Sequence, residues 1–325
     1  MLEETVRNSS ADRRRANRST QRQCRVRARA VFPGRRLKIT RRCFERRFFL
    51  TPDNPKVRQI IGYLLGYCLD RYGLKLHAAC FMGNHYHLDV TDVHGNYPEF
   101  KAVFNGLLAR VLNAHRGRFD RFWSADRPCD VELLDDNDVL RRMAYTIANP
   151  VSAGLVPRSQ RWPGFTSAGV AFGSTMSFER PSGFFDSPDS DMPKTVEVRI
   201  ERPPIMKHLS DEELMTELDR EVREREFEAA QKLRQEGRRF ALETRIARQK
   251  WHRRPRTFEQ RFTTTPSVAA SCKWSRIAAL QRNCDWEQAY ADAREADVPG
   301  TSPVYPYGTY ARRRYGGARV AAAPS

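Results

Sequence analysis

The chain is 325 residues long, 40% hydrophobic, and carries a formal net charge of +18. This length and apolar content suffice for one sizeable core and a second, smaller domain. No apolar run reaches the roughly 20 residues that span a bilayer, and the arginine-rich start lacks the apolar segment of a secretory signal. Seven scattered cysteines without a C-x-x-C pair argue against a disulfide framework and against a thiolate zinc site. We therefore expect a soluble protein of the reducing cytoplasm with no membrane partner.

The positive charge is concentrated near the N-terminus. Residues 1–47 contain 16 Lys and Arg against 4 Asp and Glu, which accounts for +12 of the total. A basic arm of this kind favours nucleic acid as the partner, because its cations neutralise phosphates and release counterions. Residues 1–30 are also polar and poor in aromatic side chains, so we expect them to be a disordered basic arm.

Hydrophobic periodicity predicts an alternation of strands and helices after the arm. The predicted elements are a strand over 35–40, a helix over 55–71, strands over 74–81 and 85–92, a helix over 98–114, a strand over 130–134, and a helix that begins after Asp136 or Asn137. We expect the last helix to end at Ala148, because Asn149-Pro150 follows and a residue before proline disfavours the helical conformation. This order predicts an α+β fold with a ferredoxin-like, split βαβ antiparallel sheet and helices on one face.

The composition changes after Pro163. Residues 173–194 are rich in Ser, Pro, Gly and Asp, which is typical of a linker. Ser210 and the acidic residues behind it mark a helix start, and a break is expected near Gly237. The predicted organisation is a basic arm over 1–30, a folded core over 31–168, a linker over 169–205, and a mostly helical, basic extension over 206–325.

Two histidines stand one residue apart in the third predicted strand. Side chains at i and i+2 of a strand share a face, so His85 and His87 form a pair of imidazoles on a rigid element. Such a pair can bind a divalent cation, although a structural role is the common alternative. Asp89 lies on the same face and could orient an imidazole as a second-shell acceptor. A solvated carboxylate at the strand end is the other interpretation of Asp89.

Tyr145 and Asn149 are four residues apart on the last predicted helix and therefore share one face. If this face lies over the histidine strand, two imidazoles, one amide and one phenol converge. Imidazole and amide donors suit Mg²⁺, Mn²⁺ or Zn²⁺ and leave positions open for substrate. A phenol is a poor nucleophile unaided, but a cation that polarises a phosphodiester relieves this problem. The arrangement predicts phosphoryl transfer to Tyr145.

Two stretches resemble motifs of the REP-associated tyrosine transposases, within the single-tyrosine HUH transposase superfamily. Residues 78–88, AACFMGNHYHL, resemble the family's A-y-v-M-p-N-H-v-H-l, and residues 145–156, YTIANPVSAGLV, resemble its Y-I-h-l-N-P-v-r-A-G-L-v. The likeness covers about residues 30–168. Gly83 and Ser152 depart from the family's usual proline and basic residue, and neither is a catalytic position.

The resemblance implies specific roles for the residues of these motifs. His85 and His87 would bind Mg²⁺ or Mn²⁺ together with Asn149, and Tyr145 would be the nucleophile. The implied reaction cuts single-stranded DNA beside a hairpin through a 5′-phosphotyrosine and rejoins it without a nucleotide cofactor. The implied location is the prokaryotic cytoplasm near the nucleoid, with a monomer and a dimer both left open. Candidate DNA contacts on the first strand are Arg35, Arg36, Lys38, Arg41 and Arg42.

Two alternatives remain beside this hypothesis. His85-x-His87-x-Asp89 also matches part of the H-x-H-x-D-H motif of metallo-β-lactamase-like hydrolases, but Val90 stands where the last histidine should be. The stronger alternative is a catalytically silent, transposase-derived protein that binds single-stranded or hairpin DNA. The four intact motif positions favour the enzyme.

Overall fold

The computed structural model describes residues 28–125, 129–187, 190–241, 243–256 and 266–324. The chain divides into a larger compact unit, residues 32–280, and a smaller unit that joins residues before 32 to those from 281 onward. The predicted basic arm, residues 1–30, lies almost entirely outside the described residues, so its disorder and its DNA role stay predictions. Each described helix is too short or too polar to cross a membrane.

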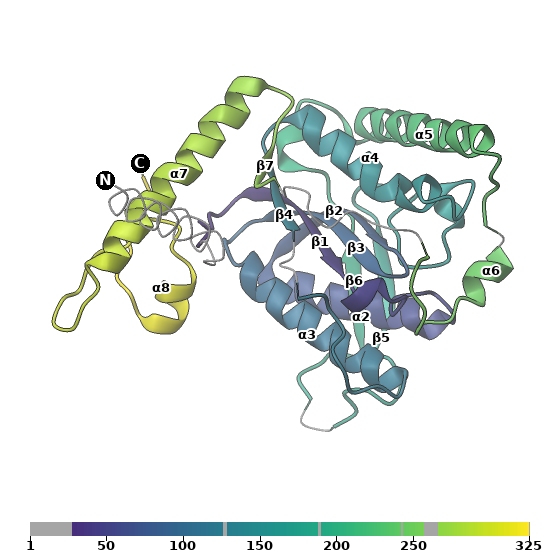
Figure 1. The fold of residues 1–325 in the computed structure, drawn as a ribbon, viewed down its shortest axis with the longest axis horizontal. Helices are drawn as coiled ribbons and strands as arrows, with labels where there is room; N and C mark the ends of the chain where they lie inside the picture. Colours follow the sequence, from purple (N-terminus) through teal and green to yellow (C-terminus); the bar gives the residue numbers. More distant parts are fainter. Residues whose placement is uncertain (1–27, 126–128, 188–189, 242, 257–265, 325) are drawn as a thin grey trace, which may run out of the picture. The chain divides into compact units, whose positions relative to one another are not determined.

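The larger unit is built on a five-stranded sheet in the order β2-β3-β1-β4-β7 (Figure 1). The strands are β1 (Arg35–Arg42), β2 (Leu74–Phe81), β3 (His85–Asp92), β4 (Cys129–Leu133) and β7 (Val268–Ala269). Neighbours among the first four are antiparallel, and β7 adds in parallel to β4. With the helices between them, β1 to β4 form the βαββαβ unit, so the predicted ferredoxin-like α+β fold is confirmed.

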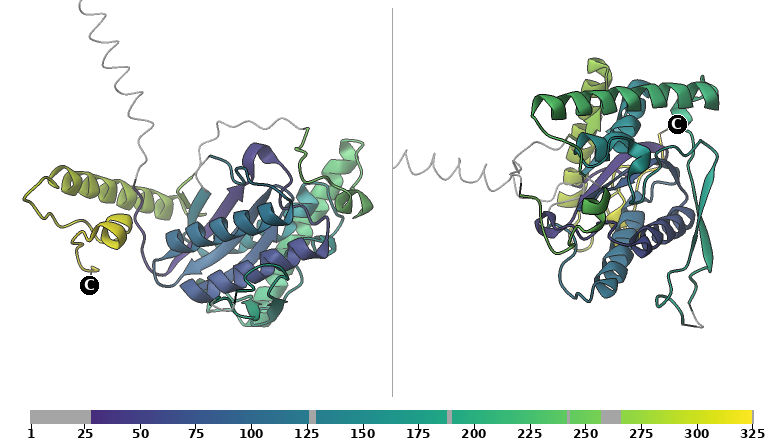
Figure 2. Two further views of the ribbon diagram at one scale, coloured as in Figure 1. Left: turned by 90° about the horizontal axis from the view of Figure 1, so that it is seen from below. Right: turned by 90° about the vertical axis from the view of Figure 1, so that its right-hand side faces the viewer.

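The two helices of this unit, α2 (Pro55–Tyr72) and α3 (Tyr97–His115), cover one face of the sheet (Figure 2). Asn54 caps α2 by accepting a hydrogen bond from the Val57 amide, and Gly73 ends the helix in the left-handed conformation, with φ 62°. Tyr86 of β3 points to this face, where its hydroxyl donates to Asn105 of α3 at 2.9 Å. The alternate residues of β3, including both histidines, therefore point to the opposite face.

That opposite face carries α4 (Asp136–Ser152), against which α5 (Asp211–Gln235) packs (Figures 1 and 2). The predicted end of α4 at Asn149-Pro150 is wrong, because the helix continues through Pro150 to Ser152. A proline this close to a helix end removes only one intrahelical hydrogen bond. Burial of Pro150 and Val151 favours the continued helix, and the chain turns only at Gly154, with φ 70°.

The segment predicted to be a linker, residues 169–205, contains an antiparallel pair of strands, β5 (Thr175–Glu179) and β6 (Thr195–Arg199). The pair packs on α2 at two glycines: a Cβ on Gly62 would lie 2.4 Å from the Phe178 ring, and one on Gly66 would lie 2.9 Å from the Glu197 carbonyl. Five-residue strands at the two ends of a Ser- and Pro-rich loop give too short a pattern for sequence analysis. The domain boundaries at 168 and 205 stay predictions.

The extension is helical where the sequence predicts it. Ser210 and Glu213 form a complete capping box at the start of α5, and Gly237 follows its end in the left-handed conformation, with φ 64°. The remaining helices are α6 (Glu243–Ala247), α7 (Lys273–Glu295) and α8 (Ala311–Gly316).

His77 of β2 generates a prediction about stability. Its Nδ1 donates to the Glu201 carbonyl at 2.7 Å, and its Nε2 accepts from the Thr91 hydroxyl at 2.8 Å. Burial lowers the pKa of His77 to about 4, whereas the unfolded chain binds this proton near pH 6.5. The stabilising contribution of neutral His77 is therefore present above pH 6.5 and is lost as the pH falls toward 4.

Urea unfolding at pH 7 and pH 5 measures this effect. We expect His77 alone to remove about 2 kcal/mol of unfolding free energy over that interval. Glutamine does not titrate, so the unfolding free energy of His77→Gln should fall by about 2 kcal/mol less than that of the wild type between pH 7 and pH 5. An identical pH dependence in the wild type and the variant would contradict the assignment.

Candidate active site

Antiparallel pairing of β1 with β3 sets the polar side chains of the two strands opposite one another on the α4 face. The facing pairs are Arg42 with His85, Thr40 with His87, and Lys38 with Asp89. Residues directly opposite in such a ladder are close enough for their side chains to interact. The face therefore presents a row that begins with an exposed arginine and a histidine and ends with a buried ion pair.

The two imidazoles lie side by side, with ring centroids 4.9 Å apart. His87 is buried, and its Nδ1 lies 2.8 Å from the Thr40 hydroxyl. His85 is half-buried and its Nδ1 donates to the Asn84 side-chain oxygen at 2.7 Å. The Nε2 atom of His87 is buried and has no hydrogen-bond partner among the described residues. A hydroxyl that accepts from Nδ1 leaves the Nε2 lone pair available to a ligand.

The surroundings keep His87 neutral. Burial lowers the pKa of His87 well below its ordinary value, and the positive charge of Lys38 lowers it further, as do His85 and Arg42. A charged imidazole would have to give up its hydration beside other cations. A neutral imidazole is the form that binds a metal ion.

Tyr145 of α4 lies above the histidine pair. Its ring centroid is 5.5 Å from that of His87 at an interplanar angle of 79°, and the side chain is 38% exposed. Lys38 Nζ lies 5.0 Å from the centroid of the Tyr145 ring. The structure therefore brings His85, His87 and Tyr145 together. Asn149 lies one turn further along the same helix and is buried.

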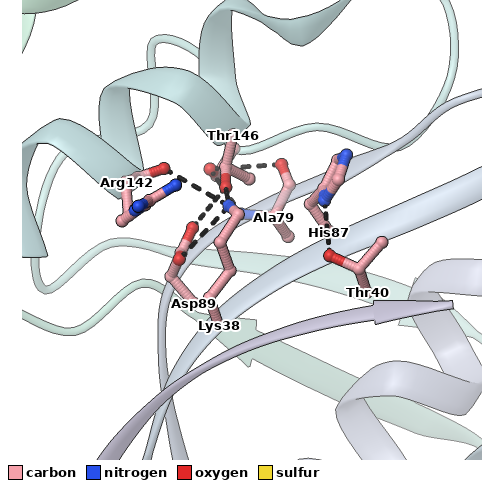
Figure 3. A network of polar contacts seen from close by, with 8 residues as sticks. Lys38, Thr40, Ala79, His87, Asp89, Arg142 and Thr146 are labelled. Carbon is pink, nitrogen blue, oxygen red and sulfur yellow. Dashed lines mark hydrogen bonds and ion pairs between the residues drawn. The ribbon is translucent and has the colours of Figure 1, made fainter. Parts of the chain in front are cut away.

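A buried polar network joins the two strands to α4 (Figure 3). Lys38 Nζ lies 3.5 Å from Asp89 Oδ1, donates to the Arg142 carbonyl at 3.4 Å, and contacts the Thr146 hydroxyl. The Thr146 hydroxyl in turn donates to the second oxygen of Asp89. Burial raises the pKa of Asp89, and the adjacent Lys38 opposes this shift. Burial lowers the pKa of Lys38, and the negative charge of Asp89 opposes this shift.

This network corrects two predictions from the sequence. Asp89 does not orient an imidazole: Thr40 contacts His87 Nδ1, and Asp89 is paired with Lys38 and Thr146. Lys38 is not a DNA contact, because it is only 6% exposed and points under α4. The sequence could not identify Thr40, since its contact with His87, 47 residues further along the chain, depends on the register between β1 and β3.

The arginines of β1 that were predicted to bind DNA differ in their contacts and in their exposure to solvent. Arg35 pairs with Glu132 at 3.4 Å, Arg36 donates to the Leu133 and Leu134 carbonyls, and Arg41 donates to the Ser124 carbonyl. Arg42 is exposed at the end of β1, opposite His85. Among these basic residues of β1, Arg42 is the one that both faces solvent and lies beside the histidine pair.

Within the described part of the chain, no group of three or more His, Cys, Asp and Glu side chains is placed to hold a metal ion. A metal at this site would therefore depend on the two histidines and on a donor of another kind. The amide oxygen of Asn149 is the candidate on α4. Such a set leaves coordination positions open, as a catalytic site requires.

Comparisons with known proteins add little to this geometry. No family model and no curated protein matches the chain. A solved structure of a REP-associated tyrosine transposase bound to a REP hairpin is similar over 43% of this chain and 81% of that chain, with 16% identity and a TM-score of 0.37. A likeness this low supports no inference about activity, so the functional assignment rests on the motifs and on the site itself.

The buried ion pair of Lys38 and Asp89 should make the stability of the fold depend on both partners. Asp89→Leu leaves an unpaired ammonium in the core, and we expect it to lower the free energy of unfolding by about 3 kcal/mol or more. Lys38→Met leaves Asp89 with one hydrogen bond and should also destabilise. The double variant removes both charges and should be more stable than Asp89→Leu alone. Urea unfolding of the four proteins measures the coupling, and strictly additive losses would contradict it.

Proposed function

We propose that this protein is a metal-dependent single-stranded DNA endonuclease and strand transferase, with Tyr145 as its nucleophile. One observation carries the proposal: a half-exposed tyrosine ring on α4 lies 5.5 Å from the ring of His87, a buried histidine with an unpartnered Nε2. The HUH and tyrosine motifs of residues 78–88 and 145–156 supply the substrate class, DNA beside a hairpin.

The residues of the site fit a divalent cation such as Mn²⁺ or Mg²⁺. His87 presents a buried nitrogen without a partner, and His85 stands next to it. His85, His87 and the Asn149 amide oxygen would hold the ion. When bound, such a cation polarises the oxygens of the scissile phosphate and lowers the barrier to attack.

The reaction then follows from the nucleophile. Tyr145 Oη attacks phosphorus and loses its proton, while the bond from phosphorus to the 3′ oxygen breaks and that oxygen takes up a proton. The products are a 5′-phosphotyrosine and a free 3′-hydroxyl. Another 3′-hydroxyl reverses the step and releases Tyr145, so the phosphodiester energy is conserved and no nucleotide is consumed. Arg42, exposed beside His85, is placed to contact a phosphate of the bound strand.

A covalent-adduct assay tests the proposal. Labelled single-stranded oligonucleotides that tile the DNA flanking the gene are incubated with protein and Mn²⁺ or Mg²⁺, then separated after heating in SDS. We expect a metal-dependent adduct with the wild type and at least a hundredfold less with Tyr145→Phe or His87→Ala. Tyr315→Phe changes a tyrosine that is 71% exposed and serves as the matched control with normal adduct. DNA binding without an adduct on any tile would favour the silent DNA-binding alternative.

Thr40 is a positioning residue, because it holds His87 by Nδ1. Loss of such an outer hydrogen bond commonly weakens metal binding by about 10- to 100-fold. We therefore expect Thr40→Val to raise the Mn²⁺ concentration needed for half-maximal adduct by this factor. Thr40→Ser keeps the hydroxyl and should restore the wild-type requirement. An unchanged requirement in Thr40→Val would show that the contact does not position the ligand.

A further inference from the structure

A segment of the C-terminal extension docks on the core at the loop that follows β1. The Trp251 ring lies 6.3 Å from that of Phe49, and the guanidinium groups of Arg116 and Arg118 lie 5.7 and 6.0 Å from the Trp251 centroid. The backbone that follows is also fixed, because the Phe48 amide donates to the Arg253 carbonyl at 3.0 Å. Residues 251–254, outside the region of motif resemblance, thus take a defined place on the larger unit.

One tight turn lies between this segment and the site. It is the 3-10 turn Phe44–Arg46, in which Glu45 and Arg46 have φ of 50° and 57°. These left-handed conformations cost energy in residues with side chains and are retained where surrounding contacts enforce them. Asn84 supplies one such contact: its side-chain nitrogen donates to the Arg46 carbonyl at 3.2 Å, and its oxygen accepts from His85.

The other side of the turn touches the docked segment. Arg47 donates to the His252 carbonyl at 2.8 Å and pairs with Glu45 at the same distance. The turn and the segment border an open surface cavity of about 460 Å³, lined by Glu45, Arg47, His252, Arg253 and Arg254. The Asn84 side chain and the turn therefore connect His85 to this cavity through hydrogen bonds.

The cavity carries an excess of positive charge. Glu45 is compensated by Arg47, whereas Arg253 and Arg254 are exposed and form no ion pair with any described residue. Two exposed guanidinium groups on an anchored backbone suit an anion with several oxygens, because the planar fork of arginine donates to phosphate in a bidentate manner.

We propose that Arg253 and Arg254 form a phosphate-binding subsite that holds the backbone of the single-stranded DNA next to its cleavage position. That the ligand is single-stranded DNA rests on the function proposed above. The subsite would give the C-terminal extension a role in substrate binding. An acidic peptide is the competing ligand, but the hydrogen-bonded link from the turn through Asn84 to His85 favours the DNA substrate over it.

Binding and its salt dependence test the subsite without cleavage. The full chain carrying Tyr145→Phe is titrated into a labelled single-stranded oligonucleotide between 50 and 200 mM salt, and the affinity is followed by fluorescence anisotropy. Each lost phosphate contact should reduce the slope of log affinity against log salt by about 0.7, so Arg253→Gln/Arg254→Gln should reduce it by about 1.4. The affinity loss across this salt range should then be about sevenfold smaller than in the parent.

Lys194→Gln/Arg199→Gln is the matched control, because it removes two exposed positive charges near and within β6. The control should keep the slope of the parent, and Arg254→Gln alone should give half the change of the double variant. Thermal unfolding checks that each variant is folded, as expected for exposed side chains.

The outcomes separate the subsite from the proposed function. An equal slope in the double variant and its control would overturn the subsite, even if the wild type forms the covalent adduct. A selective change of slope in a protein that never forms the adduct would support the subsite and contradict the endonuclease. Selective loss of binding to labelled polyglutamate, with the DNA slope unchanged, would assign the subsite to an acidic peptide instead.

Discussion

The arrangement of the site depends on the buried network of Lys38, Asp89 and Thr146. These residues come from β1, β3 and α4, and neither of the two charged ones could be buried at low cost without its partners. The network fixes the rotation of α4 over the sheet, because Thr146 must reach Asp89. Tyr145 is the preceding residue on the helix, so this constraint also sets its ring above His87.

The same network shapes the electrostatics of the histidine pair. Burial lowers the pKa of His87, and the nearby Lys38 ammonium and His85 imidazole lower it further. The site therefore combines the neutral Nε2 of His87 with the exposed Arg42, which lies opposite His85. A neutral donor next to an exposed cation is suited to a site that must accept both a metal ion and a phosphodiester.

Much of the fold could be predicted from the sequence, because its signals are local. The helix predicted over 55–71 is α2, and Ser210 with the acidic residues behind it starts α5, as predicted. The histidine face of β3 also follows from the period of a strand. The partners of its side chains do not: Lys38 looks like a surface cation until the register places it opposite Asp89, and Thr40 has no local signal for its contact with His87. Packing likewise overrides the local preference of Pro150 to end α4.

In the reaction we propose, Tyr145 is the residue that is joined to DNA. Digestion of the SDS-stable adduct with nuclease and protease, followed by mass spectrometry, identifies the tyrosine that carries the residual 5′-phosphonucleotide. We expect this mass on the peptide that contains Tyr145, and we expect no adduct when EDTA is present in the reaction. A nucleotide mapped to any other tyrosine, or an adduct that forms equally well with EDTA, would contradict Tyr145 as the metal-dependent nucleophile.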